Sequence, residues 1–231
     1  MACLENKNKA RGILMELKLI DNKGDNTLEK LISKKITKHS KISIQTAAFS
    51  IFAFHALQKE IKRSKELRLI LTKSFFEKEE TSFLKRYEIA QKKENISGSK
   101  YEIKLRNKMN TAFIARETAR LIKEKVRFHQ LDPEQSALDE LLIENDADES
   151  SLVVPAMFKF TSDGLGITES NNVSSMTAID GADDNYFAGI KTDFDNIWND
   201  PKKSREVTDK VLKKVKTIYQ ENSPEWIYFV S

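Results

Sequence analysis

Apolar and polar positions alternate in short runs through the first third of the chain, and the period of each run predicts an element. Residues 41–49, KISIQTAAF, have the two-residue period of a core strand, and residues 66–72, ELRLILT, have that of a second strand. The residues between them, 50–64, are predicted to form one helix capped by Ser50. Strand, helix and strand in this order predict a right-handed parallel β-α-β unit, with the two strands as neighbours in a sheet.

Similar patterns predict elements in the rest of the chain. The predicted strands cover residues 13–20, 126–131, 151–160 and 171–180. The predicted helices cover residues 27–39, with Thr27 as N-cap, and residues 111–126, 186–200 and 204–222. In the second of these helices one apolar side is predicted to hold Phe113, Ile114, Ala115, Ala119, Leu121 and Ile122. Residues 73–110 and 136–151 give no clear pattern, apart from helical pieces that break at Ser97-Gly98.

Strands and helices that alternate in this way predict a mixed α/β fold, in which helices flank one sheet. No internal repeat and no linker composition divides the chain. We therefore expect a flexible tail at residues 1–12 and a single domain at residues 13–231.

Charge and cysteine content narrow the class of protein. The 231 residues carry a net charge of +4, with a basic first half, an acidic stretch over residues 132–200 and a basic return over residues 202–216. A single cysteine, Cys3, excludes an internal disulfide and, with three histidines, fits no zinc site, so we expect no metal and no cofactor. The longest apolar stretch, residues 46–57, is too short to cross a bilayer, and no signal peptide is present, so we expect a cytoplasmic protein without membrane contact.

Motifs for nucleotide binding or serine hydrolysis are absent: the chain has no G-x-x-x-x-G-K-[ST], no G-x-G-x-x-G and no G-x-S-x-G. Ser50 is read as a helix cap. His129, at the end of a predicted strand, is either a nucleophile or a histidine with local hydrogen bonds, and His55 is read as structural.

Two groups of basic residues are predicted to lie where helices lead into strands, at the amino edge of the parallel strands. They are Lys34, Lys35, Lys38 and Lys41 in the first group and Lys59, Lys62, Arg63 and Lys65 in the second. Such groups form either an ordinary solvated surface or a contact surface for the phosphate backbone of nucleic acid.

The order and the amino-acid sequences of four segments resemble the phospholipase D-like nuclease domain. This domain is found at the N-terminus of bacterial Swi/Snf-type helicases and in restriction or phage-defence systems. The segments are KISIQTAAFSIFAFHALQKEIKRSKELRLIL, FIARETARLIKEKVRF, FKFTSDGLGI and FDNIWND with VLKKVKTIYQENSPEWIYF. The resemblance implies a phospholipase D-like sheet, a homodimer, and a phosphodiesterase site built from histidine, lysine, serine and asparagine. In such helicases the last segment leads into the motor, so we expect a stand-alone subunit or an excised domain.

The residues at the implied catalytic positions differ from the family's pattern. His129 stands where the resemblance implies the nucleophile, but the lysine expected two residues later is Leu131. The expected glycine, two serines and asparagine are replaced by Ala156, Met157, Phe158 and Lys159, whereas Phe160-Thr161 and Gly164-Leu165-Gly166 are kept. Asp132 and Glu134, close to His129 in sequence, are expected to repel an anion.

These differences predict a catalytically degenerate domain that acts as a DNA-binding or assembly module, with a helicase or another defence-system subunit as partner. The residues expected to contact DNA are Lys34, Lys35, Lys38, Lys159, Thr161 and Ser162. One alternative is an active, metal-independent nuclease that uses His129. Another is a protein-only adaptor whose contact surface is the acidic segment 139–149.

Overall fold

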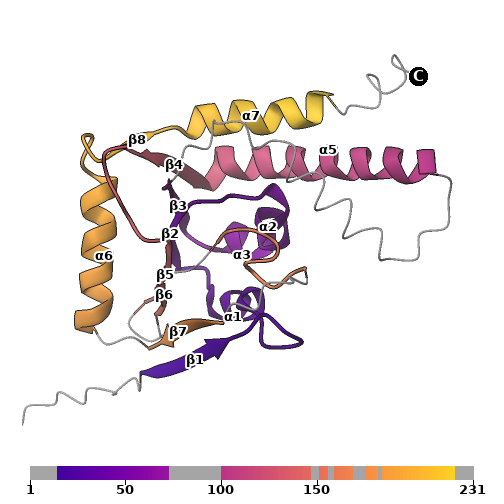
Figure 1. The fold of residues 1–231 in the computed structure, drawn as a ribbon. Helices are drawn as coiled ribbons and strands as arrows, with labels where there is room; N and C mark the ends of the chain where they lie inside the picture. Colours follow the sequence, from indigo (N-terminus) through magenta and orange to yellow (C-terminus); the bar gives the residue numbers. More distant parts are fainter. Residues whose placement is uncertain are drawn as a thin grey trace, which may run out of the picture.

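The fold is known from a computed structural model, and it is built around one eight-stranded sheet (Figure 1). The structure describes residues 15–72, 100–146, 151–155, 159–168, 175–181 and 184–221. The predicted tail at residues 1–12, the break at Ser97-Gly98 and the C-terminal segment from residue 222 lie outside the described residues. The sheet with flanking helices confirms the predicted mixed α/β class.

The strands are β1 (Glu16–Ile20), β2 (Lys41–Thr46), β3 (Glu66–Leu71), β4 (Val126–Leu131), β5 (Glu140–Glu144), β6 (Leu152–Pro155), β7 (Met176–Asp180) and β8 (Ser204–Glu206). The helices are α1 (Leu28–Lys35), α2 (Ile51–Ala56), α3 (Gln58–Arg63), α5 (Lys100–Lys125), α6 (Asp184–Trp198) and α7 (Thr208–Glu221). Among these helices none is long and apolar enough to cross a membrane.

The sheet has the order β1-β7-β6-β5-β2-β3-β4-β8. Its centre is the parallel set β2-β3-β4, and the register pairs Ile42 with Leu67 and Thr46 with Leu71. This confirms the predicted β-α-β unit and its neighbouring strands. All other pairs are antiparallel. We call the side on which β2, β3 and β4 begin the amino edge, and the side on which they end the carboxyl edge.

Helices cover the two faces of the sheet unequally. Helices α1, α2, α3, α5 and α7 lie on one face, and α6 lies alone on the other (Figure 1). The first face holds the main core, at whose centre the Phe49 ring contacts the rings of Phe54, Phe128 and Phe160 at centroid distances of 5.2–5.8 Å. The second face holds a small cluster of Ile70, Leu131 and Phe194 beneath α6. This arrangement leaves polar side chains between α6 and the sheet.

Both predicted helix caps are confirmed. The Thr27 hydroxyl accepts a hydrogen bond from the Lys30 backbone N–H, and the Ser50 hydroxyl accepts one from that of Phe52. A side-chain oxygen at this position satisfies a backbone donor that the first turn of a helix leaves without a partner.

Several predicted elements are wrong in detail. The single helix predicted for residues 50–64 is two helices, because Leu57 leaves the helical conformation at φ −94° and ψ 12° and turns its side chain into the core. The helix predicted for residues 204–222 begins at Thr208, since residues 204–206 pair with β4 as strand β8. The side chain of Phe113, predicted on the apolar side of its helix, is 57% exposed.

Two further differences concern where elements lie. The segment 136–151, which gave no pattern, contains the central strand β5, whose Leu141, Leu142 and Ile143 are buried. Helix α5 begins at Lys100, eleven residues before the predicted start at Thr111.

Candidate functional site

Residues 159–166, which follow β6 along the chain, form a tight turn. The Thr161 hydroxyl accepts a hydrogen bond from the Gly164 N–H at 3.2 Å, and the Leu165 N–H donates to the Thr161 carbonyl at 2.9 Å. A Cβ atom on Gly164 would lie 2.2 Å from the Lys159 carbonyl oxygen, which no side chain tolerates. The turn therefore requires glycine at this position for steric reasons alone.

Asn22 ties this turn to the start of α1. Its side-chain N–H donates to the Gly164 carbonyl at 2.9 Å, and its side-chain oxygen accepts from the Leu28 N–H at 3.0 Å. The Glu29 N–H donates to the Leu165 carbonyl at 2.9 Å. A Cβ atom on Gly166, whose φ is +76°, would approach the Asn22 oxygen to 2.7 Å. The glycines of DGLG therefore serve the packing of the turn against α1.

The turn leaves few side-chain groups for a ligand. Lys159 is exposed, Ser162 is partly exposed, and Thr161 is buried with its hydroxyl bonded inside the turn. Met157 and Phe158 lie outside the described residues. Of the three residues predicted here as DNA contacts, only Lys159 is thus exposed.

His129 lies on the face of the sheet that α6 covers. Its ring stacks on the Trp198 ring with a centroid distance of 3.8 Å and an interplanar angle of 19°. Its Nδ1 lies 2.9 Å from the Ser204 hydroxyl, and that hydroxyl donates to the Ile197 carbonyl at 2.7 Å. Because the Ser204 proton is used in this way, the Ser204 oxygen accepts from His129 Nδ1–H, which leaves Nε2 unprotonated in the neutral ring.

Burial lowers the pKa of His129, Glu206 opposes that change, and the nearby Arg68 adds to it. The neutral ring is therefore the ordinary form near pH 7. Leu131, where the resemblance implies a catalytic lysine, is buried in the cluster beneath α6. Within the described residues no hydrogen bond or ion pair joins His129 to Lys159.

An arginine that the sequence analysis did not single out lies beside this histidine. The Arg68 guanidinium donates to Asp195 of α6 at 2.7 Å and to the Ser43 hydroxyl at 3.0 Å, and it lies over the Phe194 ring at 4.8 Å. Burial alone would raise the pKa of Asp195, but hydrogen bonds from Lys191 and Arg68 lower it. The pair therefore stays charged and fastens α6 to the sheet.

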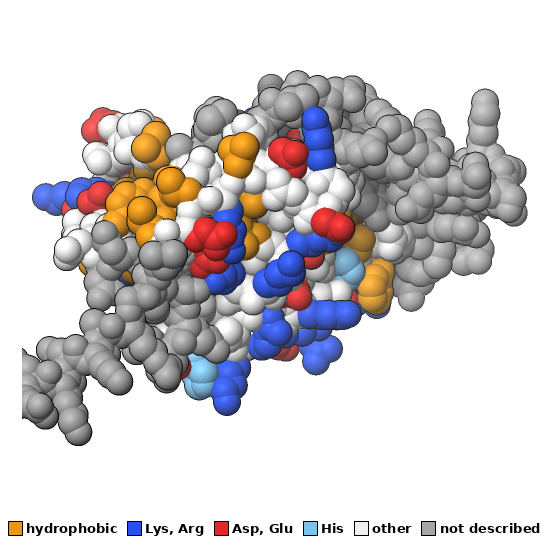
Figure 2. Space-filling model, turned by 90° about the horizontal axis from the view of Figure 1, so that it is seen from below, with side chains coloured by type: hydrophobic (Ala, Val, Ile, Leu, Met, Phe, Trp, Pro, Cys, Tyr) orange, Lys and Arg blue, Asp and Glu red, His pale blue; other side chains and the backbone are white. Residues whose placement is uncertain are grey.

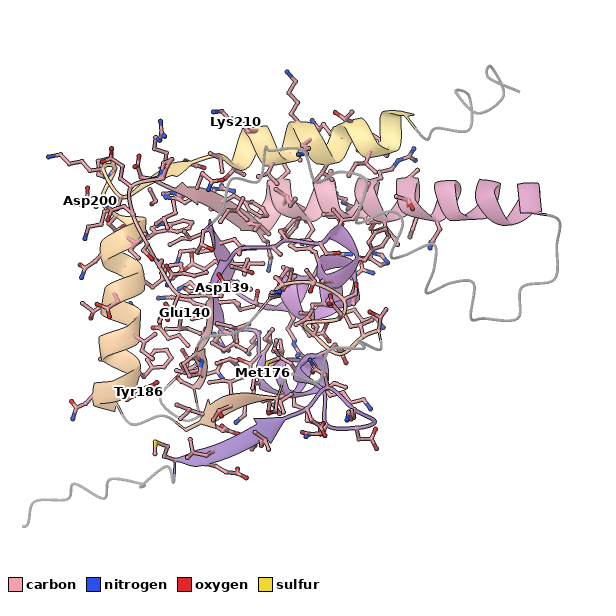
Figure 3. All side chains as sticks on the ribbon, in the orientation of Figure 1. Asp139, Glu140, Met176, Tyr186, Asp200 and Lys210 are labelled. Atoms are coloured by element: carbon pink, nitrogen blue, oxygen red, sulfur yellow. The ribbon has the colours of Figure 1, made fainter. Side chains whose placement is uncertain are left out.

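The carboxyl edge is rich in carboxylates. The Gln45 side chain donates to Glu140, and the Asp139 carboxylate accepts from the Thr72 hydroxyl at 2.9 Å (Figure 3). Burial raises the pKa of Glu140 to about 7, against the effect of the Gln45 hydrogen bond and with help from Asp193. Within the described ranges no three His, Cys, Asp or Glu side chains are grouped so as to hold a metal ion.

Basic side chains gather instead at the amino edge. Helices α1, α3 and α5 all end there, and cations are favoured at the carboxyl-terminal end of a helix. The Arg63 guanidinium donates to the Ser33 carbonyl at 3.2 Å, and the Lys65 N–H donates to the Ser40 carbonyl at 2.9 Å, so the ends of α1 and α3 lie together. We call the exposed members of this group the basic edge: Lys34, Lys38, Lys62, Arg63 and Lys65.

Lys35 differs from its neighbours in the first predicted group. Its ammonium pairs with the buried Asp180 carboxylate, which also pairs with Lys18 at 2.6 Å. Figure 2 shows Lys and Arg side chains gathered on one part of the face seen from below. The structure therefore separates the predicted DNA contacts: Lys34 and Lys38 belong to the basic edge, whereas Lys159 lies at the carboxyl edge.

The acidic segment 139–149, predicted as the contact surface of an adaptor, is only partly on the surface. Residues 141–143 are buried in β5, and Glu144 lies 3.9 Å from the Lys41 ammonium. Residues 147–149 lie outside the described residues. The described part therefore offers no continuous acidic surface.

No protein-family model and no curated protein sequence matches the chain. Solved structures with similar folds include phosphatidylserine synthase from Haemophilus influenzae Rd KW20 (TM-score 0.45, 9% identity, 90% of this chain and 44% of that chain). A second is polyphosphate kinase from Porphyromonas gingivalis (TM-score 0.45, 12% identity, 84% of this chain and 27% of that chain). A third is yeast tyrosyl-DNA phosphodiesterase (TM-score 0.38, 11% identity, 72% of this chain and 32% of that chain). The chain spans less than half the length of each, and at these TM-scores the likeness carries no conclusion about activity.

Proposed function

We propose that this chain is a phospholipase D-like domain without phosphodiesterase activity, which binds the DNA backbone through its basic edge. We further propose that it serves as an assembly module of a bacterial helicase, restriction or phage-defence system. The observation that carries the DNA part is the group of exposed cations at the amino edge, where the ends of α1 and α3 lie together.

The surroundings of His129 support the absence of catalysis. A nucleophilic histidine needs an open line of attack and a cation that holds the phosphate charge. Stacking on Trp198 covers a face of the ring but leaves the Nε2 lone pair, which lies in the ring plane, uncovered. Attack is therefore opposed by the missing cation, because Leu131 occupies the position expected for the lysine. The chain therefore keeps a histidine at the family position while its surroundings serve packing.

The composition of the basic edge supports contact with phosphates rather than with bases. Lysine is a point charge on a flexible stem, and lysine contacts to the backbone carry no sequence information. Five cations that each neutralise one phosphate would give a plot of log K against log salt concentration with a slope of about −4 to −5. We therefore expect binding that depends strongly on salt and weakly on sequence.

Fluorescence anisotropy with a labelled duplex of random sequence, at several salt concentrations, tests this proposal. The double variant Lys34→Glu/Lys38→Glu should lower the magnitude of the slope by about 2, because two phosphate contacts are lost. The matched control is Lys210→Glu/Lys213→Glu on the outer side of α7, which changes the net charge by the same amount (Figure 3). The control should keep the wild-type slope.

Two outcomes would contradict the proposal. If both double variants lowered the magnitude of the salt slope equally, net charge rather than the basic edge would drive binding. For the catalytic part, supercoiled plasmid should stay intact during incubation with the protein, with or without magnesium. Nicking by the wild-type chain that His129→Ala abolishes would instead establish an active nuclease.

A further inference from the structure

Helix α5 carries one exposed aromatic ring on a side that is otherwise charged. The Phe113 side chain is 57% exposed. The exposed residues that follow it on this helix are all charged, and they are Arg116, Arg120, Lys123 and Glu124. A single exposed apolar side chain is ordinary on a protein surface, so the meaning of this ring depends on its neighbours. Those neighbours are a second ring and several cations.

The His55 ring of α2 holds Phe113 in place. The two ring centroids lie 6.0 Å apart at an interplanar angle of 81°, which is a favourable edge-to-face arrangement. The Gln58 side chain lies within hydrogen-bond distance of His55 Nε2, at 3.4 Å. Burial lowers the pKa of His55, Glu117 opposes that change and Lys62 adds to it, so the ring is neutral near pH 7. Since an edge contact covers at most one face of a ring, His55 leaves at least one face of Phe113 uncovered.

Cations connect this ring to the basic edge. Glu117 lies one turn after Phe113 on α5, about 6 Å along the helix axis, and its carboxylate is 3.9 Å from the Lys62 ammonium. Lys62 belongs to the basic edge, and its charge offsets that of Glu117. Lys59, one turn earlier on α3, is exposed, and so is Arg116, one turn after Phe113. The ring therefore lies beside an exposed surface that carries positive charge.

We propose that an unpaired base of single-stranded DNA stacks on Phe113, while the neighbouring phosphates lie along Lys59, Lys62 and the rest of the basic edge. The stacking site rests on the DNA binding proposed above and specifies the form of DNA that gains from it. An aromatic ring beside a positively charged surface holds single strands without reading their sequence, because every base has a flat face that can stack. The bases of a duplex are stacked on one another and do not reach the ring.

The charge around Phe113 favours nucleic acid over a protein as the occupant. The centre of a specific protein interface is depleted of charged side chains. Here charged side chains flank the ring on two helices, with Arg116 and Glu117 on α5 and Lys59 and Lys62 on α3. Single-stranded DNA fits this combination, because its phosphates pair with the cations and its bases supply a flat apolar face.

Fluorescence anisotropy with a labelled oligothymidine strand and a blunt duplex of equal length tests the stacking site. Phe113→Ala should weaken binding of the strand about tenfold and leave binding of the duplex unchanged. The salt slope of the strand should stay as in the wild-type chain, because stacking releases no counterions, whereas Lys34→Glu/Lys38→Glu should lower its magnitude. The matched control is Tyr186→Ala, at an aromatic residue that is 39% exposed on α6, and it should change neither affinity.

Two further variants separate stacking from apolar contact and from damage to the fold. Phe113→Leu keeps an apolar side chain without a π face, so it should weaken binding of the strand as much as Phe113→Ala does. Phe113→Trp should bind the strand at least as tightly as the wild-type chain, and oligothymidine should quench the emission of the added indole.

Three results would overturn the stacking site: wild-type affinity of Phe113→Ala for the strand, wild-type affinity of Phe113→Leu for the strand, or an equal loss for strand and duplex in Phe113→Ala. The basic edge would survive each of them if the duplex still bound the wild-type chain with the expected salt slope. If the wild-type chain bound neither form of DNA at low salt, the proposed DNA binding itself would be wrong, and the stacking site with it.

Discussion

The pH dependence of stability should reveal the half-buried carboxyl of Glu140. Burial raises the pKa of this group from 4.5 to about 7 in the folded chain. In the unfolded chain it returns to its ordinary value. Folding therefore favours the protonated form, and Glu140→Gln, which copies the shape of that form, removes the titration while keeping an oxygen that can accept from Gln45.

The sign and size of the effect follow from proton linkage. Between pH 4.5 and 7 the folded chain holds a proton on Glu140 that the unfolded chain has lost, so the free energy of unfolding falls as pH rises. Each pKa unit corresponds to about 1.4 kcal/mol, which sets an upper bound of about 3.5 kcal/mol. Because the side chain is only partly buried, solvent screens the charge, and we expect a loss of about 1–2 kcal/mol by pH 7.

Urea unfolding of the wild-type chain and of Glu140→Gln, at half-unit steps from pH 4 to 8.5, measures this difference. The variant should gain stability relative to wild type as pH rises through the window, and the difference should be level above about pH 7.5. Glu134→Gln, the same substitution at an exposed residue, is the matched control for the change of charge. The same pH profile for both variants would refute the reasoning.

Four further substitutions have expected outcomes. Gly164→Ala should cost about 1–3 kcal/mol in urea unfolding, because its Cβ would meet a backbone oxygen at 2.2 Å. Gly189→Ala, in an open position of α6, should instead stabilise by about 0.5–1 kcal/mol, and equal effects of the two would contradict this steric reading. Phe160→Ala should cost about 3–5 kcal/mol, because the ring is buried in the main core; a loss below 1 kcal/mol would contradict it. Trp198→Ala should raise the pKa of His129 toward 6.5 in an NMR titration, because the ring that buries it is gone; an unchanged pKa would contradict the stacking.

The central part of the fold could be predicted because its signals are local. Alternation in residues 41–49 and 66–72 marks two strands, and Ser50 marks the start of the helix between them. The preference for a right-handed crossover and the length of the segment between the two strands then favour a parallel pair. The prediction of a single helix failed at Leu57, because both halves have helical periodicity and only packing against the core reveals the turn.

Strand β5 could not be recognised because its signal is short and acidic. Three apolar residues stand between Glu140 and Glu144, within a run of carboxylates that resembles a polar loop. Contacts far apart in sequence make the strand possible: Gln45 bonds to Glu140, and Lys41 and Lys191 lie near Glu144. Such partners are visible only once the chain is folded.

The same limit applies to the candidate site. The sequence places His129 on a strand end but does not show that Trp198 and Ser204, about 70 residues later, cover the ring and fix its tautomer. The sequence does not show that Lys34 and Lys159 lie at opposite edges of the sheet. Lys34 lies at the end of α1, before β2 begins, whereas Lys159 precedes Phe160, which bridges to Phe49 beyond the end of β2. Arg68 looked like an ordinary polar residue of a strand, because its partner Asp195 comes from the distant helix α6.

The pairing of β1 with β7 also bears on how the chain folds during synthesis. Residues 16–20 pair with residues 176–180, so β1 leaves the ribosome about 160 residues before its partner strand. At roughly 5–20 residues per second, β1 stays unpaired for about 8–30 s. During that time the apolar side chains of Leu17 and Leu19 and both unpaired edges of β1 are open to chaperones and to neighbouring nascent chains. Translation speed over the second half of the message should therefore influence how much of the protein reaches the native sheet.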